Sequence, residues 1–473
     1  MSLRSLLVSL CVLRVLCGES TAAEPGPWGT YRGTPQRTGN TDNKAGPEKP
    51  VVLWAVRSND HFLAAPVPVK DSVFVAGVGA FNRPTVTLFP LTEQPPTKAT
   101  WAKSAPYLKL ASVSSPAVAG EYLVFGDGMH QDSGGVLHCV SAATSKPVWQ
   151  LTLPGDLIHL EGGPLVAGNR AYIGGGAAGV ICVETDKATL DGKEHDLATV
   201  SKMQDAKWKE LSAKYEELKA KKDDFAIPPD DSQLLKFAPK KVWQKGEAKW
   251  HVDAPVNLAG DTLLVPTSYL DKEKVGERAL YALSAATGET VWKRELALNP
   301  WGGATVAGDL AIVPGSSIGY YLKELKGAKG DVTAIDLKTG EVKWKKDVPG
   351  GVVGCVAVSD GLAVFTATDG KVRAFKAADG ERAWLYDCKF PVFAPPAVAG
   401  GVVYAADLNG VVHAVDLKTG TPKWTLAAAK DGGAPGMVYG GVTVHGGKLI
   451  VATCNLEGPN AGKETVVVCI GTK

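Results

Sequence analysis

"DLKTGEVKW" occupies Asp336–Trp344, and nearly the same nine residues return as "DLKTGTPKW" at Asp416–Trp424. Each copy joins a Thr-Gly turn to a tryptophan. Further copies with the same spacing are "SAATSKPVW" (Ser141–Trp149), "SAATGETVW" (Ser284–Trp292) and "KAADGERAW" (Lys376–Trp384). An internal repeat decides the architecture of a chain, so its period has to be found before anything else.

The tryptophans that end these copies give the period. Weaker copies end at Trp101 and Trp243, and Trp54 has the same strand context without a copy before it. Successive intervals are 47, 48, 94, 49, 52, 40 and 40 residues. The doubled interval contains a segment unlike the rest, so the unit is 40–52 residues long. A period in this range, with several short strands in each unit, is typical of β-propeller blades.

Each unit is expected to contain four strands. The segment "APVNLAGDTLLVPTS" predicts two strands around a tight turn, and "RALYALSA" and "TVWKREL" predict two more around the Thr-Gly turn. Glycine supplies the positive φ that such turns need. After Trp424 the chain has three further strands, and the strand with Trp54 can complete that last blade. We therefore predict an all-β, eight-bladed propeller over residues 51–473, closed by its N-terminal strand.

One tryptophan in each blade is predicted to dock on the neighbouring blade, because a large flat side chain buries much apolar surface there. These residues are Trp54, Trp101, Trp149, Trp243, Trp292, Trp344, Trp384 and Trp424. Three cysteines, Cys139, Cys182 and Cys469, fall where other blades have alanine, which predicts small buried side chains.

The segments outside the repeat are an N-terminal signal, a leader and an insertion. Residues 1–23 have a positive charge, a short apolar stretch and small residues at the end, which predicts a cleaved signal peptide and a periplasmic or secreted protein. Residues 24–50 form a leader segment. Residues 186–240 interrupt blade three with a helical pattern, and this insertion is either a surface excursion packed on the rim or a helix that docks a partner.

Composition excludes two classes of partner. The 473 residues contain 51 Lys and Arg against 49 Asp and Glu, so no basic excess points to nucleic acid. No apolar run after the signal is long enough to span a membrane.

No glycine-rich phosphate loop, nucleophile elbow or Cys-x-x-Cys pair occurs. We expect a monomer.

The repeat Ala-x-Asp-x-x-Thr-Gly-x-x-x-Trp, seen in "AIDLKTGEVKW" and "AVDLKTGTPKW", resembles the pyrroloquinoline quinone (PQQ) repeat. The leader "WGTYRGTPQRTG" (Trp28–Gly39) is similar to the leaders of exported propellers of this type. The resemblance implies one of two functions. Quinoprotein dehydrogenases hold PQQ and calcium in the channel, whereas the propeller lipoprotein of the outer-membrane β-barrel assembly machinery is not an enzyme. The chain lacks the vicinal cysteines and the matching calcium ligands of the first branch, and the anchor cysteine of the second.

Candidate site residues lie on the face where blades connect. His159 and Glu161 precede one blade, His251 and Asp253 precede the next, and Trp301 precedes the one after. Such convergent polar groups at a channel mouth predict a small polar ligand or a cation, although carboxylates that bond backbone amides would look the same. A separate long loop offers Asp127, His130 and Asp132 as metal ligands, although it also reads as a solvated loop.

We expect an exported, non-catalytic scaffold or binding propeller of the cell envelope. Its partners would be envelope proteins or a small polar ligand, and no cofactor is expected. The alternative is a PQQ-dependent or degenerate quinoprotein oxidoreductase with calcium.

Overall fold

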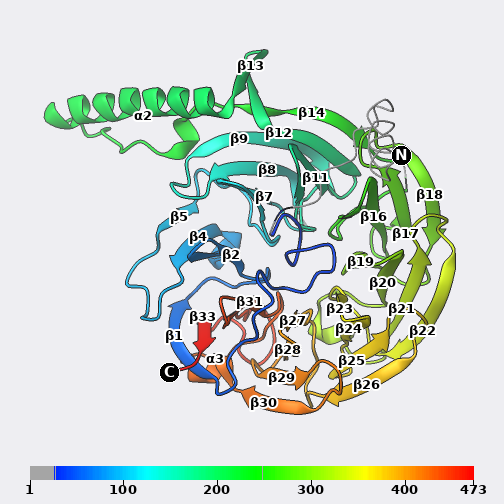
Figure 1. The fold of residues 1–473 in the computed structure, drawn as a ribbon. Coiled ribbons are helices and arrows are strands. Elements are labelled where there is room, and N and C mark those ends of the chain that lie inside the picture. The colour runs from blue at the N-terminus through cyan, green and yellow to red at the C-terminus, as the bar shows by residue number, and fades with distance from the viewer. Residues whose placement is uncertain (1–25, 27, 131, 248) are drawn as a thin grey trace, which may run out of the picture.

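The computed structural model describes residues 26, 28–130, 132–247 and 249–473. Its strands form four-stranded antiparallel sheets arranged as blades around a centre (Figure 1). The predicted β-propeller class is confirmed. The signal-peptide prediction for residues 1–23 lies outside the described residues.

Within the described residues there are eight such sheets, one of which has a fifth strand, and we number the blades in chain order. Blade 1 contains β2 (Val67–Val69), β3 (Ser72–Val78), β4 (Pro84–Pro90) and β5 (Trp101–Ser104). Blade 2 contains β6 (Ala117–Ala119), β7 (Tyr122–Gly126), β8 (Ser133–Ser141) and β9 (Pro147–Asp156). Blade 3 contains β10 (Leu165–Ala167), β11 (Arg170–Gly174), β12 (Val180–Leu190) and β14 (Ala238–Lys245), with β13 (Lys193–Asp196) added to β12. Blade 4 contains β15 (Asn257–Ala259), β16 (Thr262–Leu270), β17 (Val275–Ser284) and β18 (Thr290–Glu295).

The second half of the ring repeats this order. Blade 5 contains β19 (Thr305–Ala307), β20 (Leu310–Ser316), β21 (Lys329–Asp336) and β22 (Val342–Pro349). Blade 6 contains β23 (Ala357–Ser359), β24 (Leu362–Thr366), β25 (Lys371–Lys376) and β26 (Arg382–Asp387). Blade 7 contains β27 (Ala397–Ala399), β28 (Val402–Ala406), β29 (Val412–Asp416) and β30 (Pro422–Leu426). Blade 8 contains β31 (Thr443–His445), β32 (Lys448–Ala452), β33 (Thr465–Gly471) and β1 (Val51–Ser58). Helix α3 (Ala428–Asp431) and 3-10 turns at Ala80–Asn82, Asp231–Gln233 and Leu322–Glu324 complete the described elements.

Blade 8 joins the two ends of the chain. Strand β1 pairs antiparallel with β33, and this pairing sets Trp54 opposite Cys469 (Figure 1). The position opposite the blade tryptophan is alanine in blades 4 to 7 and cysteine in blades 2, 3 and 8. All six cysteines of the described residues are buried and free.

The Thr-Gly turn recurs because it packs on the tryptophan of the preceding blade. Gly340 has φ +70°, and a Cβ there would lie 2.8 Å from Cδ2 of Trp292. The indole Nε1 of Trp292 donates a hydrogen bond of 2.9 Å to the carbonyl of Leu337, in the same turn. Indoles of seven of the eight blade tryptophans donate to a carbonyl in this way: those of Trp54, Trp101, Trp243, Trp292, Trp344, Trp384 and Trp424.

Trp149 is the exception, and the insertion explains it. Its buried Nε1 has no hydrogen-bond partner, because β12 continues to Leu190 where the other blades make their tight turn. Helix α2 (Leu197–Ala220) follows and projects away from the ring (Figure 1). Only Val200 and Gln204 of this helix are fully buried, so its base packs on the rim and its distal half does not. Among the described residues, no helix combines the length and the apolar character needed to cross a bilayer.

The leader lies at the centre of the ring (Figure 1), and it touches the innermost strands one after another. Carbonyls of the leader accept hydrogen bonds from Val118, Val166, Val306, Val358, Val398 and Val444, and from the amide side chain of Asn257. Blades 2 to 8 therefore all bond to one segment of about a dozen residues, which fills the hub of the propeller.

Candidate metal centre

Four side chains converge on the face that carries the connections between blades, which we call the connection face. In antiparallel four-stranded blades, the loop between the second and third strands opens on this same face. His130 comes from the β7–β8 loop of blade 2, and His159 comes from the connection between blades 2 and 3. His251 and Asp253 come from the connection between blades 3 and 4. One potential ligand atom of each side chain lies within 4.8 Å of all the others.

The carboxylate of Asp253 is the common partner of two imidazoles. Its Oδ1 lies 2.7 Å from Nε2 of His159 and 3.0 Å from Nε2 of His251. The ring centroid of His130 lies 5.3 Å from that of His159 and 6.0 Å from that of His251. The three imidazoles therefore surround one carboxylate oxygen.

Burial leaves several nitrogens of this cluster without a partner. His159 and His251 are 0% exposed, and Asp253 is 7% exposed. Neither ring nitrogen of His251 makes a hydrogen bond of good geometry, and Nδ1 of His159 makes none. Buried polar atoms normally find a partner, so each orphan nitrogen calls for an explanation, and coordination of a metal ion is one.

The electrostatics of the cluster favour an ionised Asp253 beside a protonated His159, and a metal ion would have to displace the proton on His159. Burial lowers the pKa of His159, but the hydrogen bond and charge of Asp253 outweigh it, and the pKa is raised to about 8. Burial raises the pKa of Asp253, but the hydrogen bond from His159 and the close imidazole of His251 outweigh this and hold it below its ordinary range. Burial lowers the pKa of His130. Burial also raises the pKa of neighbouring Glu161, to about 7.

Glycine makes room for the two buried imidazoles. Gly176 has φ +56°, and a Cβ there would lie 3.3 Å from Cε1 of His251 and 3.4 Å from Cε1 of His159. It would also lie 2.3 Å from the carbonyl oxygen of Leu157, and this backbone atom cannot easily move away. The left-handed φ and the close approach both require glycine at this position.

Three nitrogens and one oxygen form a donor set suited to a transition-metal ion. Imidazole binds Zn²⁺, Cu²⁺, Fe²⁺ and Ni²⁺ well, whereas Ca²⁺ prefers oxygen ligands. In a tetrahedral zinc site with bonds near 2 Å, neighbouring ligand atoms are roughly 3.3 Å apart. The oxygen–nitrogen distances of 2.7 and 3.0 Å would therefore have to open on binding, by up to roughly half an ångström, and the separations that approach 4.8 Å would have to close.

The sequence placed His130 in a different candidate site from His159, His251 and Asp253, and the structure brings the four together. Glu161 lies beside them, where its charge acts on the pKa of His159. Glu273, from the β16–β17 loop, was not singled out from the sequence. Its Oε1 lies 3.7 Å from Nε2 of His130. The only sequence signal for Glu273 was that blade 4 has a long loop.

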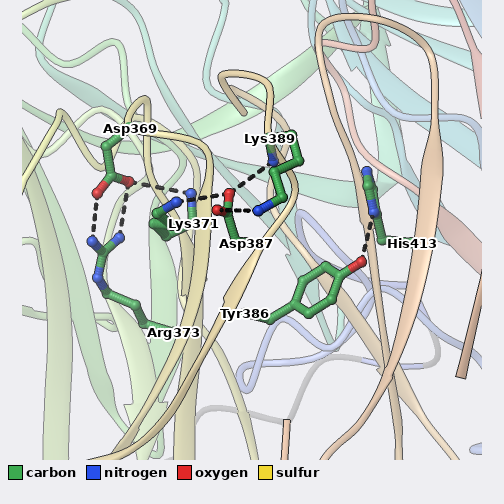
Figure 2. Close-up of polar contacts among 7 residues, drawn as sticks. All are labelled: Asp369, Lys371, Arg373, Tyr386, Asp387, Lys389 and His413. Carbon is green, nitrogen blue, oxygen red and sulfur yellow. Dashed lines mark hydrogen bonds and ion pairs between the residues drawn. The ribbon is translucent and has the colours of Figure 1, made fainter. Parts of the chain in front are cut away.

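Asp127 does not join the cluster, because it has a structural role. Its carboxylate accepts hydrogen bonds from the backbone of Val136 and from Nε2 of His138, at 2.5 and 2.9 Å. The hairpins of blades 6 and 7 use their aspartates in the same way. Asp369 pairs with Arg373 (Figure 2).

Two further candidates are not among the four ligands. Asp132 accepts a hydrogen bond of 2.8 Å from the backbone of Met129 and shapes the loop that presents His130. Trp301 packs on an apolar cluster that includes Phe393 and Tyr439. Trp301 is therefore not one of the four converging ligands.

Comparison with known proteins places the chain in a family. The family model PQQ_2, described as "Outer membrane protein assembly factor BamB", matches residues 47–208, 231–350, 277–392 and 328–463. These matches leave out residues 209–230, the distal part of the insertion. No curated protein sequence matches the chain.

Solved structures of similar fold come from both functional branches. BamB from Moraxella catarrhalis is 15% identical, over 90% of this chain and 98% of its own, with a TM-score of 0.57. A europium-containing methanol dehydrogenase is 14% identical, over 95% and 98%, with a TM-score of 0.56. The quinohemoprotein alcohol dehydrogenase ADHIIG from Pseudomonas putida HK5 is 13% identical, over 95% and 81%, with a TM-score of 0.58. Identities this low show a shared fold alone, but the family model covers most of the sequence. The chain therefore belongs to the PQQ_2 family, whose model is described as outer membrane protein assembly factor BamB.

Proposed function

We propose that this protein is an exported, non-catalytic binding module of the cell envelope, and that a divalent transition-metal ion orders its connection face. The ligands are His130, His159, His251 and Asp253. The observation that carries the proposal is His251, a fully buried imidazole whose Nδ1 has no partner and whose Nε2 has only a poorly aligned contact with Asp253. A bound metal ion would satisfy one of these nitrogens directly.

The number of ligands supports a structural role for the metal. Structural zinc sites have four protein ligands, whereas catalytic sites keep one position open for water or substrate. Four protein ligands are available here. The ion would tie the β7–β8 loop of blade 2 to the connections that enter blades 3 and 4, and would fix the surface that these loops present to a partner.

The description of the family as an outer-membrane assembly factor supports a place in the envelope and a protein partner. The signal expected at residues 1–23 supports export. On this proposal the connection face, shaped by the metal, is where an envelope protein or a small polar ligand binds.

The quinoprotein alternative fits the site less well. Calcium takes about six to eight oxygen ligands, whereas three of the four donors here are imidazole nitrogens. The chain has no vicinal cysteine pair. We therefore derive no step through a quinone from these residues.

Metal binding can be tested with the purified protein. Calorimetry should show one Zn²⁺ per chain, and Co²⁺ should give the visible absorption of a nitrogen-ligated site. His251→Asn should weaken binding at least about 100-fold, since losing a ligand costs more than losing its supporting hydrogen bond. His413→Asn is the matched control, because His413 is a buried histidine bonded to Asp407 on blade 7, away from the site. Equal affinity in the two variants would refute the site.

Enzymatic activity needs a separate test. The protein, supplied with PQQ and Ca²⁺ and an artificial electron acceptor, should not oxidise alcohols or sugars. PQQ-dependent turnover would refute the non-catalytic role whatever the outcome of the Zn²⁺ titration.

A further inference from the structure

Two arginines of the leader lie buried at the hub of the propeller. The side chains of Arg32 and Arg37 are both 0% exposed. Arginine is almost never fully buried unless a partner compensates its charge. The pair therefore needs a full account of its hydrogen bonds and of its charge.

Backbone carbonyls satisfy only part of the hydrogen-bonding capacity. Arg37 donates through Nη1 to Gly302 at 2.7 Å and through Nη2 to Pro255 at 2.8 Å. Arg32 donates through Nη2 to Pro396 at 3.0 Å. The Nε atoms of both arginines and Nη1 of Arg32 are buried and have no partner. Each unsatisfied N–H of a charged group costs more than a neutral one would.

No carboxylate neutralises the two charges. Within the described residues, the arginines that form ion pairs are Arg57, Arg83, Arg278 and Arg373, and the two hub arginines form none. The acidic groups that act on the hub guanidiniums are Tyr31 and Cys355. Burial raises the pKa of Tyr31 well above its ordinary value, and it raises the pKa of Cys355 despite both guanidiniums. Both groups are therefore neutral near pH 7.

A guanidinium cannot solve the problem by losing its proton, because its ordinary pKa lies above about 12. An isolated buried cation costs several kcal/mol unless it is paired. The guanidinium of Arg37 lies over the ring of Tyr31, 5.4 Å from its centroid, but within the described residues no such contact compensates Arg32, and an anion from solvent would.

We propose that Arg32 and Arg37 hold a small monovalent anion, such as chloride or formate, at the hub of the propeller beside Cys355. The unpartnered N–H groups of Arg32 provide its main contacts, and the charge of Arg37 adds to the attraction. A monoanion is favoured over a phosphate dianion because a second negative charge would also have to be desolvated. The ring encloses the site, so the anion enters as the leader docks.

Refolding in defined salts tests the site. The protein is unfolded in urea, which carries no charge, and refolded with chelator at constant ionic strength in sodium chloride, sodium formate or sodium gluconate. Once chloride or formate exceeds its dissociation constant, each tenfold increase should raise the folded-to-unfolded ratio tenfold. Gluconate, which is too large for an enclosed site, should have no such effect. Dependence on chloride alone or on formate alone identifies the ligand.

Variants locate the effect. Arg32→Met should abolish the anion dependence, and Arg170→Met should retain it, because Arg170 also donates to carbonyls but belongs to blade 3 and not to the leader. Cys355→Ala should retain it too, which separates an exogenous anion from a thiolate counter-ion. No anion dependence in the wild type, or the same dependence in Arg32→Met, would overturn the proposal.

A direct observation covers the case in which Arg32→Met fails to fold. Wild-type crystals grown from protein refolded in bromide should show anomalous density beside the guanidinium of Arg32. Absence of that density, together with absence of formate density in crystals of protein refolded in formate, would overturn the proposal. The chelator keeps this outcome independent of metal binding on the connection face.

Discussion

Gly340→Ala should destabilise the propeller much more than Gly361→Ala. Both glycines have the left-handed backbone, with φ of +70° and +73°. An added Cβ at Gly361 meets nothing within 4 Å. At Gly340 it would lie 2.8 Å from Cδ2 and 2.9 Å from Cε3 of Trp292, on the contact between two blades.

The magnitude follows from two contributions. An L-residue in the left-handed region costs about 1–2 kcal/mol, and both variants carry this term. Overpacking adds about 1–3 kcal/mol at Gly340 alone, because the indole of Trp292 is held by its hydrogen bond to Leu337 and cannot easily move. We therefore expect a loss of about 1–2 kcal/mol for Gly361→Ala and about 2–5 kcal/mol for Gly340→Ala.

Urea unfolding followed by tryptophan fluorescence measures the difference. The midpoint should fall further for Gly340→Ala, and Gly380→Ala should resemble it because a Cβ at Gly380 would lie 2.7 Å from Cε3 of Trp344. Comparing midpoints needs no extrapolation to water. Equal shifts in Gly340→Ala and Gly361→Ala would refute the view that the turn glycine is required by the tryptophan.

Three other predictions test the packing. Burial raises the pKa of the thiols, to about 12 for Cys182. Above about pH 8.5 the unfolded state therefore loses thiol protons that the folded state keeps. The free energy of unfolding should then fall by about 1.4 kcal/mol per pH unit for each such thiol. A Cys139→Ala, Cys182→Ala double variant should flatten that slope in unfolding assays from pH 8.5 to 10, and an unchanged slope would contradict the assignment. Trp344→Phe should cost about 1 kcal/mol more than Trp149→Phe, because only Trp344 donates a hydrogen bond, and equal unfolding midpoints would argue against this. Deleting residues 206–229 should leave the melting temperature nearly unchanged, whereas deleting 186–240 should lower it by removing buried Val200 and Phe237, and the reverse order would show that the distal arm stabilises the ring.

The fold was predictable because the same turn glycine and blade tryptophan recur along the sequence. Gly340 and Trp344 are four residues apart, and the same glycine–tryptophan spacing returns in blades 4, 6 and 7. Part of the site was predictable for the same reason. His159 and His251 occupy comparable places in successive connections, so the repeat itself brings them to the same face.

The remaining features depend on where irregular segments run. The sequence around His130 does not predict the path of its loop, so only the structure shows that His130 lies beside His159. The same is true of Arg32 and Arg37. In sequence they look like ordinary charges in a polar leader, and only the path of that leader through the hub buries them.

That path has a consequence for synthesis. The leader is made early, yet its last backbone hydrogen-bonding partner, Val444, is made much later, and β1 cannot pair until β33 is made. Contacts between residues so far apart in sequence form slowly, and unpaired strand edges invite aggregation in the meantime. A chain interrupted before residue 444 would have both its hub and its last blade unfinished. We therefore expect a truncated product to be degraded, because it cannot close the ring and its unpaired strands stay accessible to proteases.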